Sequence, residues 1–182
     1  GMVAPVRTVI QDQFGLGNEQ GIWLITIYAL FYASFIPVIG KLADRHGRKN
    51  LFLICMVLFC AGAAICGASG MLGAGFQNAF TLLLFGRVLQ AIGACGIIPL
   101  ANAEIGTSAP PEKRGFALGI TAATSGFANV LGAGVGSAII ALVGQSNWQM
   151  LFFGCIPIGI GTFIAGLAIL PKSTLRPSKR MD

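Results

Sequence analysis

The stretch "GKLADRHGRKN", residues 40–50, gathers one aspartate, four Lys or Arg residues and one histidine into eleven positions. The chain around it is very different, because 55% of its 182 residues are hydrophobic and only 10% are charged. Two uncharged segments flank its charged positions. Neither residues 20–40 nor residues 50–86 contain any Asp, Glu, Lys or Arg. A helix needs about 20 mostly apolar residues to cross a bilayer. The charged stretch therefore predicts a short turn between two transmembrane helices.

Two more uncharged stretches follow, residues 88–103 and 115–171. A small-residue segment at 67–78 and a polar turn at 144–149 divide the apolar sequence further, and Trp148 in that turn is expected at the membrane interface. The sequence lacks the alternation of membrane β-barrel strands, so we expect an all-α membrane protein. The five expected transmembrane helices cover residues 20–43, 51–69, 79–104, 115–143 and 147–170.

The formal net charge of +6 is placed very unevenly along the chain. Ten of the 12 Lys and Arg residues lie in residues 41–49, 113–114 and 172–180, which an alternating topology puts on one side of the membrane. The opposite loops, residues 70–78 and 144–147, have none. Cytoplasmic loops are enriched in Lys and Arg, so the three basic segments are expected in the cytoplasm. The positive charge thus indicates topology, and we expect no nucleic-acid partner.

The two ends of the chain are not expected to cross the membrane. Residues 1–19 are too short and too polar, and Gly1 before Met2 resembles the remnant of a tag. Residues 171–182 are expected to form a basic cytoplasmic tail or linker. The odd number of spans suggests a piece of a larger protein.

Chemistry that would mark an enzyme is not visible in the sequence. The single histidine, His46, and the cysteines have no metal-ligand spacing, so we expect no metal, no cofactor and no disulfide. We also find no nucleophile–base set and no phosphate-binding loop, and therefore do not expect an enzyme. The cysteines read as small hydrophobic residues within apolar runs: Cys55, Cys60, Cys66, Cys95 and Cys155.

The opening stretch reads G-x-L-A-D-R-x-G-R-K, and this closely resembles the signature loop of the major facilitator superfamily. In that family the loop joins the second and third transmembrane helices at the cytoplasmic side. The resemblance implies a gate that latches the two halves of the transporter together, with Asp44 facing a helix N-terminus of the other half. Gly40 and Gly47 are expected to allow close approach and a sharp turn. The expected gating residues are Gly40, Asp44, Arg45, Gly47, Arg48, Lys49 and Glu104.

Glu104 belongs to this set because we predict that it pairs with Arg48. Arg48 begins the second span and Glu104 ends the third, so both lie at the cytoplasmic face. Glu104 has no cation within four residues on its own helix. A carboxylate near a helix C-terminus is unfavourable unless a cation compensates it. The alternative is two separately solvated charges in the headgroup region.

Arg87 and Gln90 form the second candidate site, within the third span. An arginine inside the membrane is costly and indicates function, and Gln90 lies on the same helical face three residues on. Both are predicted to point into the bundle, although Arg87 could instead extend to the outer interface. The sequence resembles the R-x-x-Q-G-x-G motif, tied in antiporters to proton coupling, with Ala91 in place of the first glycine.

Small residues recur along the fourth span and are expected to allow close helix packing. Residues 132–137 resemble the G-P-x-x-G-G motif of the fifth family helix in antiporters, without its proline and last glycine. The expected packing residues are Gly126, Gly132, Gly134 and Gly136.

Residues 147–160, "NWQMLFFGCIPIGI", and residues 110–115, "PPEKRG", resemble the fourteen-helix drug:proton antiporters. The likeness covers nearly the whole chain as family helices two to six, most of one six-helix half, with residues 3–15 as the end of the first helix and its outer loop. It implies a multi-pass protein of the bacterial cytoplasmic membrane that exports small amphipathic or drug-like compounds in exchange for protons. Its other partners would be membrane lipid and the missing first helix and C-terminal half.

A second possibility remains open, namely a half-length membrane protein that dimerises or does not transport. Proton coupling needs a group that titrates, yet none of the six acids lies mid-membrane. A carboxylate partner for Arg87 must therefore come from outside this chain, or coupling is absent. The six acids are Asp12, Glu19, Asp44, Glu104, Glu112 and Asp182.

Overall fold

The structure is a computed structural model that describes residues 3, 6–72 and 78–170. The expected tag remnant at residues 1–2 and the basic tail at 171–182 lie outside the described residues. The described part is helical, with no strand, and five of its helical segments are long and apolar enough to cross a membrane. The prediction of an all-α membrane protein with five spans is confirmed.

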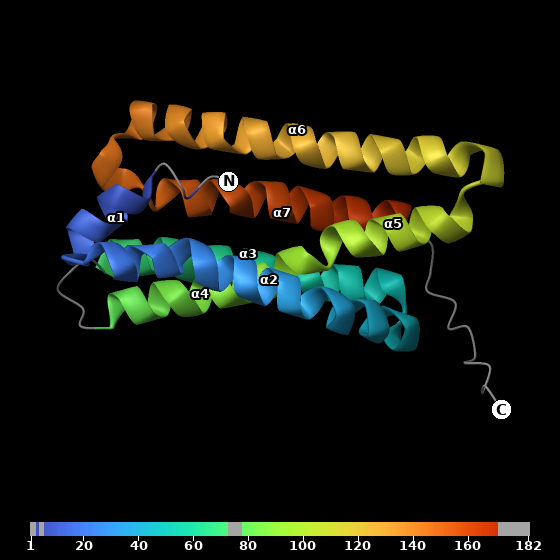
Figure 1. The fold of residues 1–182 in the computed structure, drawn as a ribbon, viewed down its shortest axis with the longest axis horizontal. Helices are drawn as coiled ribbons and strands as arrows, with labels where there is room; N and C mark the ends of the chain where they lie inside the picture. Colours follow the sequence, from blue (N-terminus) through green and yellow to red (C-terminus); the bar gives the residue numbers. More distant parts are fainter. Residues whose placement is uncertain (1–2, 4–5, 73–77, 171–182) are drawn as a thin grey trace.

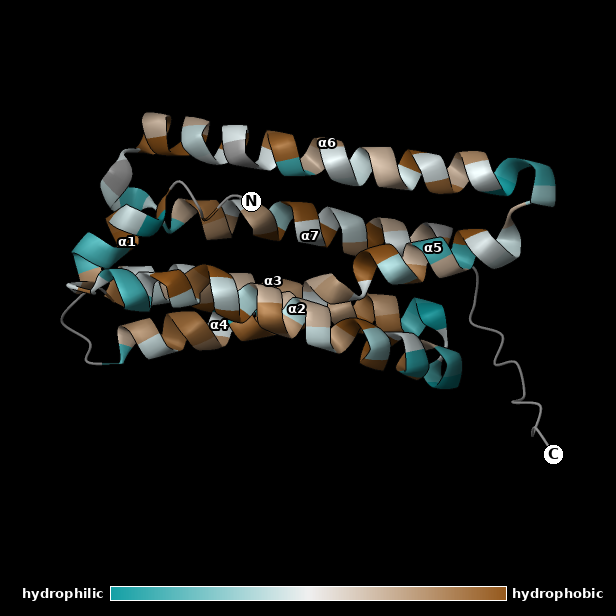
Figure 2. Cartoon of the chain, viewed as in Figure 1, coloured by the Kyte–Doolittle hydropathy of each residue, from teal (hydrophilic) through white to brown (hydrophobic). Residues whose placement is uncertain are grey.

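The helices run side by side along the long axis of the molecule, with their connections at its two ends (Figure 1). Hydrophilic residues gather at these ends and apolar residues fill the length between them (Figure 2). The α2–α3 turn, the α5–α6 turn and the end of α7 share one end, as expected for the three cytoplasmic segments. The helices are α1 (Arg7–Phe14), α2 (Asn18–His46), α3 (Arg48–Leu72), α4 (Ala79–Cys95), α5 (Ile97–Ser108), α6 (Pro111–Val143) and α7 (Met150–Ile169), with a short 3-10 turn (Gln145–Asn147) before α7.

The turn between α2 and α3 is a single residue, Gly47, so most of the charged stretch is helical. Gly47 has φ 85° and ψ 140°, a conformation that side chains disfavour and glycine adopts without strain. Gly40 behaves differently, because it lies inside α2 and a Cβ there would meet nothing within 4 Å. Gly40 therefore forms no turn and no close contact within the described chain, and a close approach to the rest of the protein stays a prediction.

Helix α4 packs closely against α3, and glycine makes this possible. A Cβ on Gly62 would lie 2.4 Å from the Gln90 backbone nitrogen, and one on Gly93 would lie 2.4 Å from the Phe59 nitrogen. Helix α2 also packs mainly on α4 and makes few contacts with α3. The predicted turn between α2 and α3 is short, but these two helices do not form a tightly packed hairpin. The glycine faces of α3 and α4, rather than chain connectivity, decide which helices meet.

The third expected span is predicted as one continuous helix, but the structure divides it into two helices. Helix α4 ends at Cys95 and α5 begins at Ile97, with Gly96 between them. Pro99 explains the break, because its ring opposes the carbonyl four residues earlier and it has no N–H to donate. Gly96 also sits against α3, where a Cβ would lie 2.6 Å from Cys55 Sγ.

The opposite end of the bundle is closed by α1, which packs over Trp148. The Trp148 side chain is 0% exposed, and its ring centroid lies 6.2 Å from that of Phe14. Its Nε1 donates a hydrogen bond to Gln13 Oε1, and Gln13 Nε2 donates to the Gly70 carbonyl at 3.3 Å. Trp148 is therefore shielded from lipid by α1, and its expected depth at the membrane interface stays a prediction.

Candidate functional site

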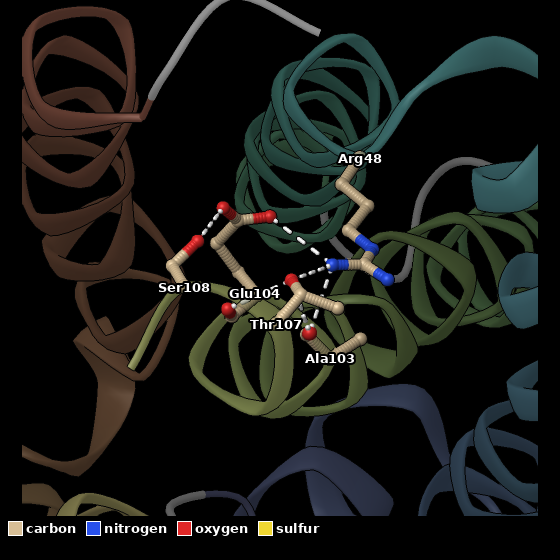
Figure 3. Close-up of polar contacts among 5 residues, drawn as sticks. All are labelled: Arg48, Ala103, Glu104, Thr107 and Ser108. Carbon is tan, nitrogen blue, oxygen red and sulfur yellow. Dashed lines mark hydrogen bonds and ion pairs between the residues drawn. The ribbon is translucent and has the colours of Figure 1, made fainter. Parts of the chain in front are cut away.

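The end of the bundle that holds the α2–α3 turn contains a polar cluster built around Arg48. From the first residue of α3, Arg48 Nη1 donates to three acceptors on α5 (Figure 3). They are the Ala103 carbonyl at 2.8 Å, Glu104 Oε2 at 3.3 Å and Thr107 Oγ1 at 2.6 Å. The other carboxylate oxygen of Glu104 accepts from Ser108 Oγ at 2.6 Å.

The predicted ion pair between Arg48 and Glu104 is confirmed, with a nitrogen–oxygen distance of 3.3 Å. Their side chains are 28% and 22% exposed, so neither is freely solvated. An exposed pair would contribute under about 1 kcal/mol. Here the Ala103 carbonyl and Thr107 hydroxyl hold the guanidinium in place as well. The cluster therefore fixes the start of α3 to the end of α5.

The neighbouring Lys49 makes an equivalent contact with a different helix. Its Nζ donates to the carbonyls of Leu167 and Leu170, both at 2.7 Å, at the C-terminal end of α7. Carbonyls at a helix C-terminus lack helical partners and carry partial negative charge, so a lysine stabilises them. The first two residues of α3 thus bind two different helices: Arg48 binds α5 and Lys49 binds α7. The resemblance to the signature loop predicts Lys49 as a gating residue, but nothing in the sequence indicates which helix Lys49 contacts.

Asp44 and Arg45, on the last turn of α2, are exposed. Within the described residues, neither has a hydrogen bond or an ion pair through its side chain. They do not join the Arg48 cluster, and their expected part in a gate stays a prediction.

Arg87 and Gln90 lie on α4 and are 7% and 3% exposed. Arg87 Nη1 donates to Gln90 Oε1 at 2.7 Å, and Arg87 Nε donates to the Leu24 carbonyl of α2 at 3.3 Å. The guanidinium carbon lies 4.2 Å from the centroid of the Tyr28 ring, a cation–π distance. The prediction that both side chains point into the bundle is confirmed, and extension of Arg87 to the outer interface is wrong.

A cavity of about 430 Å³ lies beside Arg87. Its polar lining comes from three helices: Tyr28 on α2, Arg87 and Gln90 on α4, and Asn129 on α6. The rest of its wall is largely apolar. Sequence reasoning missed Tyr28, although a tyrosine in the middle of an uncharged span could have indicated a polar interior site.

The four expected packing glycines of α6 do not behave alike. A Cβ on Gly126 or Gly134 would meet nothing within 4 Å, so neither allows close helix packing in the described chain. The reason is that α6 makes few contacts with α5 and α7. Gly132 lines the cavity and Gly136 is buried. A packing role for Gly126 and Gly134 stays a prediction about parts of the protein beyond this chain.

The glycines that do bring helices together were not expected. Among them are Gly62, Gly86 and Gly93, on α3 and α4, where an added Cβ would meet the backbone of the other helix. The seven-residue spacing of the last two is the signal that could have identified them, because it places both on one helical face.

Residues 1–180 match the Major Facilitator Superfamily. The chain is 34% identical over 182 residues to the uncharacterized MFS-type transporter YfiU of Bacillus subtilis, covering 100% of the chain and 33% of that protein. It is 34% identical over 164 residues to Multidrug resistance protein 3 of Bacillus subtilis, covering 87% and 30%. It is 32% identical over 171 residues to the Multidrug export protein EmrB of Escherichia coli, covering 94% and 31%. The chain thus spans about a third of the length of these relatives.

Proposed function

Because this chain belongs to the major facilitator superfamily, we propose that it forms part of a secondary active transporter that exports small amphipathic or drug-like compounds in exchange for protons. Relatives named for multidrug resistance and multidrug export support the class of compound. The five candidate spans make it a multi-pass membrane protein. The bacterial origin of its relatives supports the bacterial cytoplasmic membrane as its location.

The observation that carries this proposal is the buried Arg87–Gln90 pair beside the cavity. A cation within the membrane is expensive, and such residues mark substrate, ion or proton pathways. A carboxylate in contact with Arg87 is held in its ionised form until a proton displaces it. In this proposal, protonation of such an acid releases Arg87 and so changes the net charge beside the cavity. Among the described residues, no carboxylate contacts Arg87, so this acid comes from elsewhere.

The Arg48 cluster and Lys49 supply the gate in this proposal. They fix the cytoplasmic ends of α3, α5 and α7 to one another, so these helices move together. The exposed Asp44 is left to meet the other half of the transporter. Transporters of this kind alternate access by rocking one half against the other around a central site. A first helix and a C-terminal half would complete the structure.

Transport by the full-length protein tests the proposal. Inside-out vesicles are loaded with protons, and uptake of a panel of fluorescent amphipathic compounds of each charge type is followed with and without the pH gradient. We expect gradient-dependent uptake of at least one compound and its loss in Arg87→Ala, with insertion unchanged. Lys113→Ala, which removes an exposed cation, is the matched control. If no compound responds to the gradient, the proposed function is wrong, and a non-transporting protein is favoured.

A further inference from the structure

One face of α2 surrounds part of the Arg87 guanidinium. Arg87 Nε donates a hydrogen bond to the Leu24 carbonyl at 3.3 Å, and the guanidinium carbon lies 4.2 Å from the centroid of the Tyr28 ring. Leu24 and Tyr28 are four residues apart, so they lie on the same side of the helix. Helix α2 therefore offers the arginine one carbonyl and, a turn further on, one aromatic ring.

The Tyr28 ring is the closer of two rings that contact this cation. The second belongs to Phe152 on α7, whose centroid lies 5.9 Å from the guanidinium carbon. Cation–π attraction acts within about 6 Å of the ring centroid and is stronger when the contact is shielded from water. Arg87 is only 7% exposed, so its contact with Tyr28 is both short and shielded. Tyr28 therefore supplies the larger share of the stabilisation by the two rings.

The other described groups around Arg87 carry no negative charge. Its two hydrogen bonds go to a backbone carbonyl and an amide oxygen. Among the described residues, no Asp or Glu forms an ion pair with it. The titratable side chains that face it are ordinarily neutral at pH 7; they are Tyr28 on α2, Cys66 on α3 and Cys155 on α7. Whenever no acid from the rest of the protein is paired with it, dipoles and rings alone therefore stabilise this cation.

In the proposed function, Arg87 alternates between two states. It is paired with a carboxylate from the rest of the protein while that acid is ionised, and it is unpaired once the acid takes up a proton. An ion pair has little net charge, so an aromatic ring attracts a paired guanidinium less than an unpaired one. The Tyr28 ring thus lowers the free energy of the unpaired state more than that of the paired state. This difference favours protonation of the acid.

We infer that Tyr28 is a positioning residue that holds Arg87 in place while its acid partner is protonated, and that Tyr28 thereby sets the pH at which the transporter takes up its proton. This inference rests on the proposed function and adds a residue and a pH dependence to it. Removing the ring destabilises the unpaired cation, so the acid is protonated less readily and a higher proton concentration is needed. The pH of half-maximal transport therefore falls when the ring is lost.

The pH profile of transport by the full-length protein tests this inference. Inside-out vesicles take up ethidium, whose charge does not change with pH, or another dye of the panel that the unsubstituted protein transports. The pH on both sides is varied while the pH difference across the membrane is kept constant. We expect Tyr28→Leu to shift the midpoint about 0.5–1 pH unit lower, and Tyr28→Phe to shift it much less because it keeps the ring. An unshifted midpoint in Tyr28→Leu would overturn the inference.

Fluorinated phenylalanines at position 28 separate the electrostatic effect of the ring from its packing, and they apply even if Tyr28→Leu does not fold. Fluorine atoms withdraw electron density from the face of the ring and so weaken its attraction for a cation, while the ring keeps nearly the same shape. The midpoint should fall stepwise as fluorine atoms are added, starting from the value of Tyr28→Phe. A midpoint that does not respond to fluorination would show that the ring only fills space, and would refute the inference.

Phe31→Leu is the matched control on the same helix. Phe31 is half-buried like Tyr28, but its ring stacks on Phe35, with centroids 6.0 Å apart, and makes no cation–π contact with Arg87 in the described structure. Its midpoint should stay that of the unsubstituted protein, and a shift equal to that of Tyr28→Leu would refute the inference. Absence of gradient-dependent transport in the unsubstituted protein removes the proposed function and the role of Tyr28 together. Normal transport with unshifted profiles removes the role of Tyr28 alone.

Discussion

Arg48 serves three acceptors of α5 from the first residue of α3, and this makes it more than a surface charge. Only one of the three is a carboxylate. Removing Arg48 would leave Glu104 with only the Ser108 hydroxyl near the end of a helix, where a negative charge is unfavourable.

We predict that Arg48→Glu and Glu104→Arg each reduce transport by the full-length protein, and that the double reversal restores part of it. Restoration is partial because the reversed pair rebuilds the ion pair but not the bonds to the Ala103 carbonyl and Thr107. Transport rates at equal expression give the measurement. Lys41→Glu reverses a nearby exposed cation and is the control. A double mutant no better than the worse single mutant would contradict a functional role for the pair.

Lys49 stabilises the end of α7 through two carbonyls at 2.7 Å. We predict that Lys49→Met keeps the length of the side chain but frays the last turn of α7. A cation at a helix C-terminus contributes about 0.3–1 kcal/mol, so local hydrogen exchange should rise by up to roughly fivefold. Mass spectrometry of peptides covering residues 160–170 provides the measurement, with Lys41→Met as control. Unchanged exchange would show that the lysine does not hold this helix end.

The α3–α4 interface rests on glycine, since the two backbones approach too closely for side chains. This arrangement was not predictable from the order of the helices. Helices α2 and α3 are consecutive in the chain, but it is α3 and α4 that pack closely, because glycines line the surfaces that they turn to each other. The spacing of glycines on α4 indicates this contact, whereas the family resemblance predicts close packing at the glycines of α6.

We predict that Gly93→Ala destabilises the protein by about 1–3 kcal/mol, the usual cost of overpacking. The added Cβ would lie 2.4 Å from the Phe59 nitrogen, and backbone cannot move aside as a flexible side chain can. The control is Gly161→Ala on α7, where a Cβ meets nothing within 4 Å. The midpoint of thermal unfolding in detergent provides the comparison. Equal midpoints for the two variants would contradict the close α3–α4 contact.

The break between α4 and α5 at Gly96 has one signal in the sequence. The apolar run continues through it without a change of composition, so length alone predicted one span. Pro99 was the available signal, because its position four residues after Cys95 removes a helical hydrogen bond. The Arg48–Glu104 contact, in contrast, is predictable because Arg48 begins one expected span and Glu104 ends another at the same expected membrane face.

Across the whole molecule, the charge pattern predicts the membrane orientation, and the α2–α3 and α5–α6 turns lie at one end of the bundle as this prediction requires (Figure 1). The burial of Trp148 under α1 could not be foreseen, because α1 is short and polar and gave no sign of packing over the bundle. The exposed apolar residues of α6, such as Phe127 and Leu142 at 67% and 87%, suit contact with lipid or with the rest of the transporter.

The orientation itself gives the last prediction, which concerns two exposed positions at opposite ends of the bundle. Asn50 lies at the start of α3, beside the basic turn, and Ser146 lies in the turn before α7. Basic segments are retained in the cytoplasm, so these two positions should face opposite sides of the membrane. In intact cells, a membrane-impermeant maleimide should label Ser146→Cys but not Asn50→Cys. In inside-out vesicles the pattern should reverse.

The native cysteines set the background of this experiment, and the unsubstituted protein measures it. Cys55, Cys66 and Cys95 are buried, and Cys60 and Cys155 are half-buried within spans, so little reaction with a polar reagent is expected. If Asn50→Cys were labelled from outside intact cells, the basic turn would face outward. The Arg48 cluster would then lie at the outer face, and neither the cytoplasmic gate nor the direction of export could be maintained. Labelling of both positions from one side would instead contradict the alternation of five spans, which every other argument about this chain assumes.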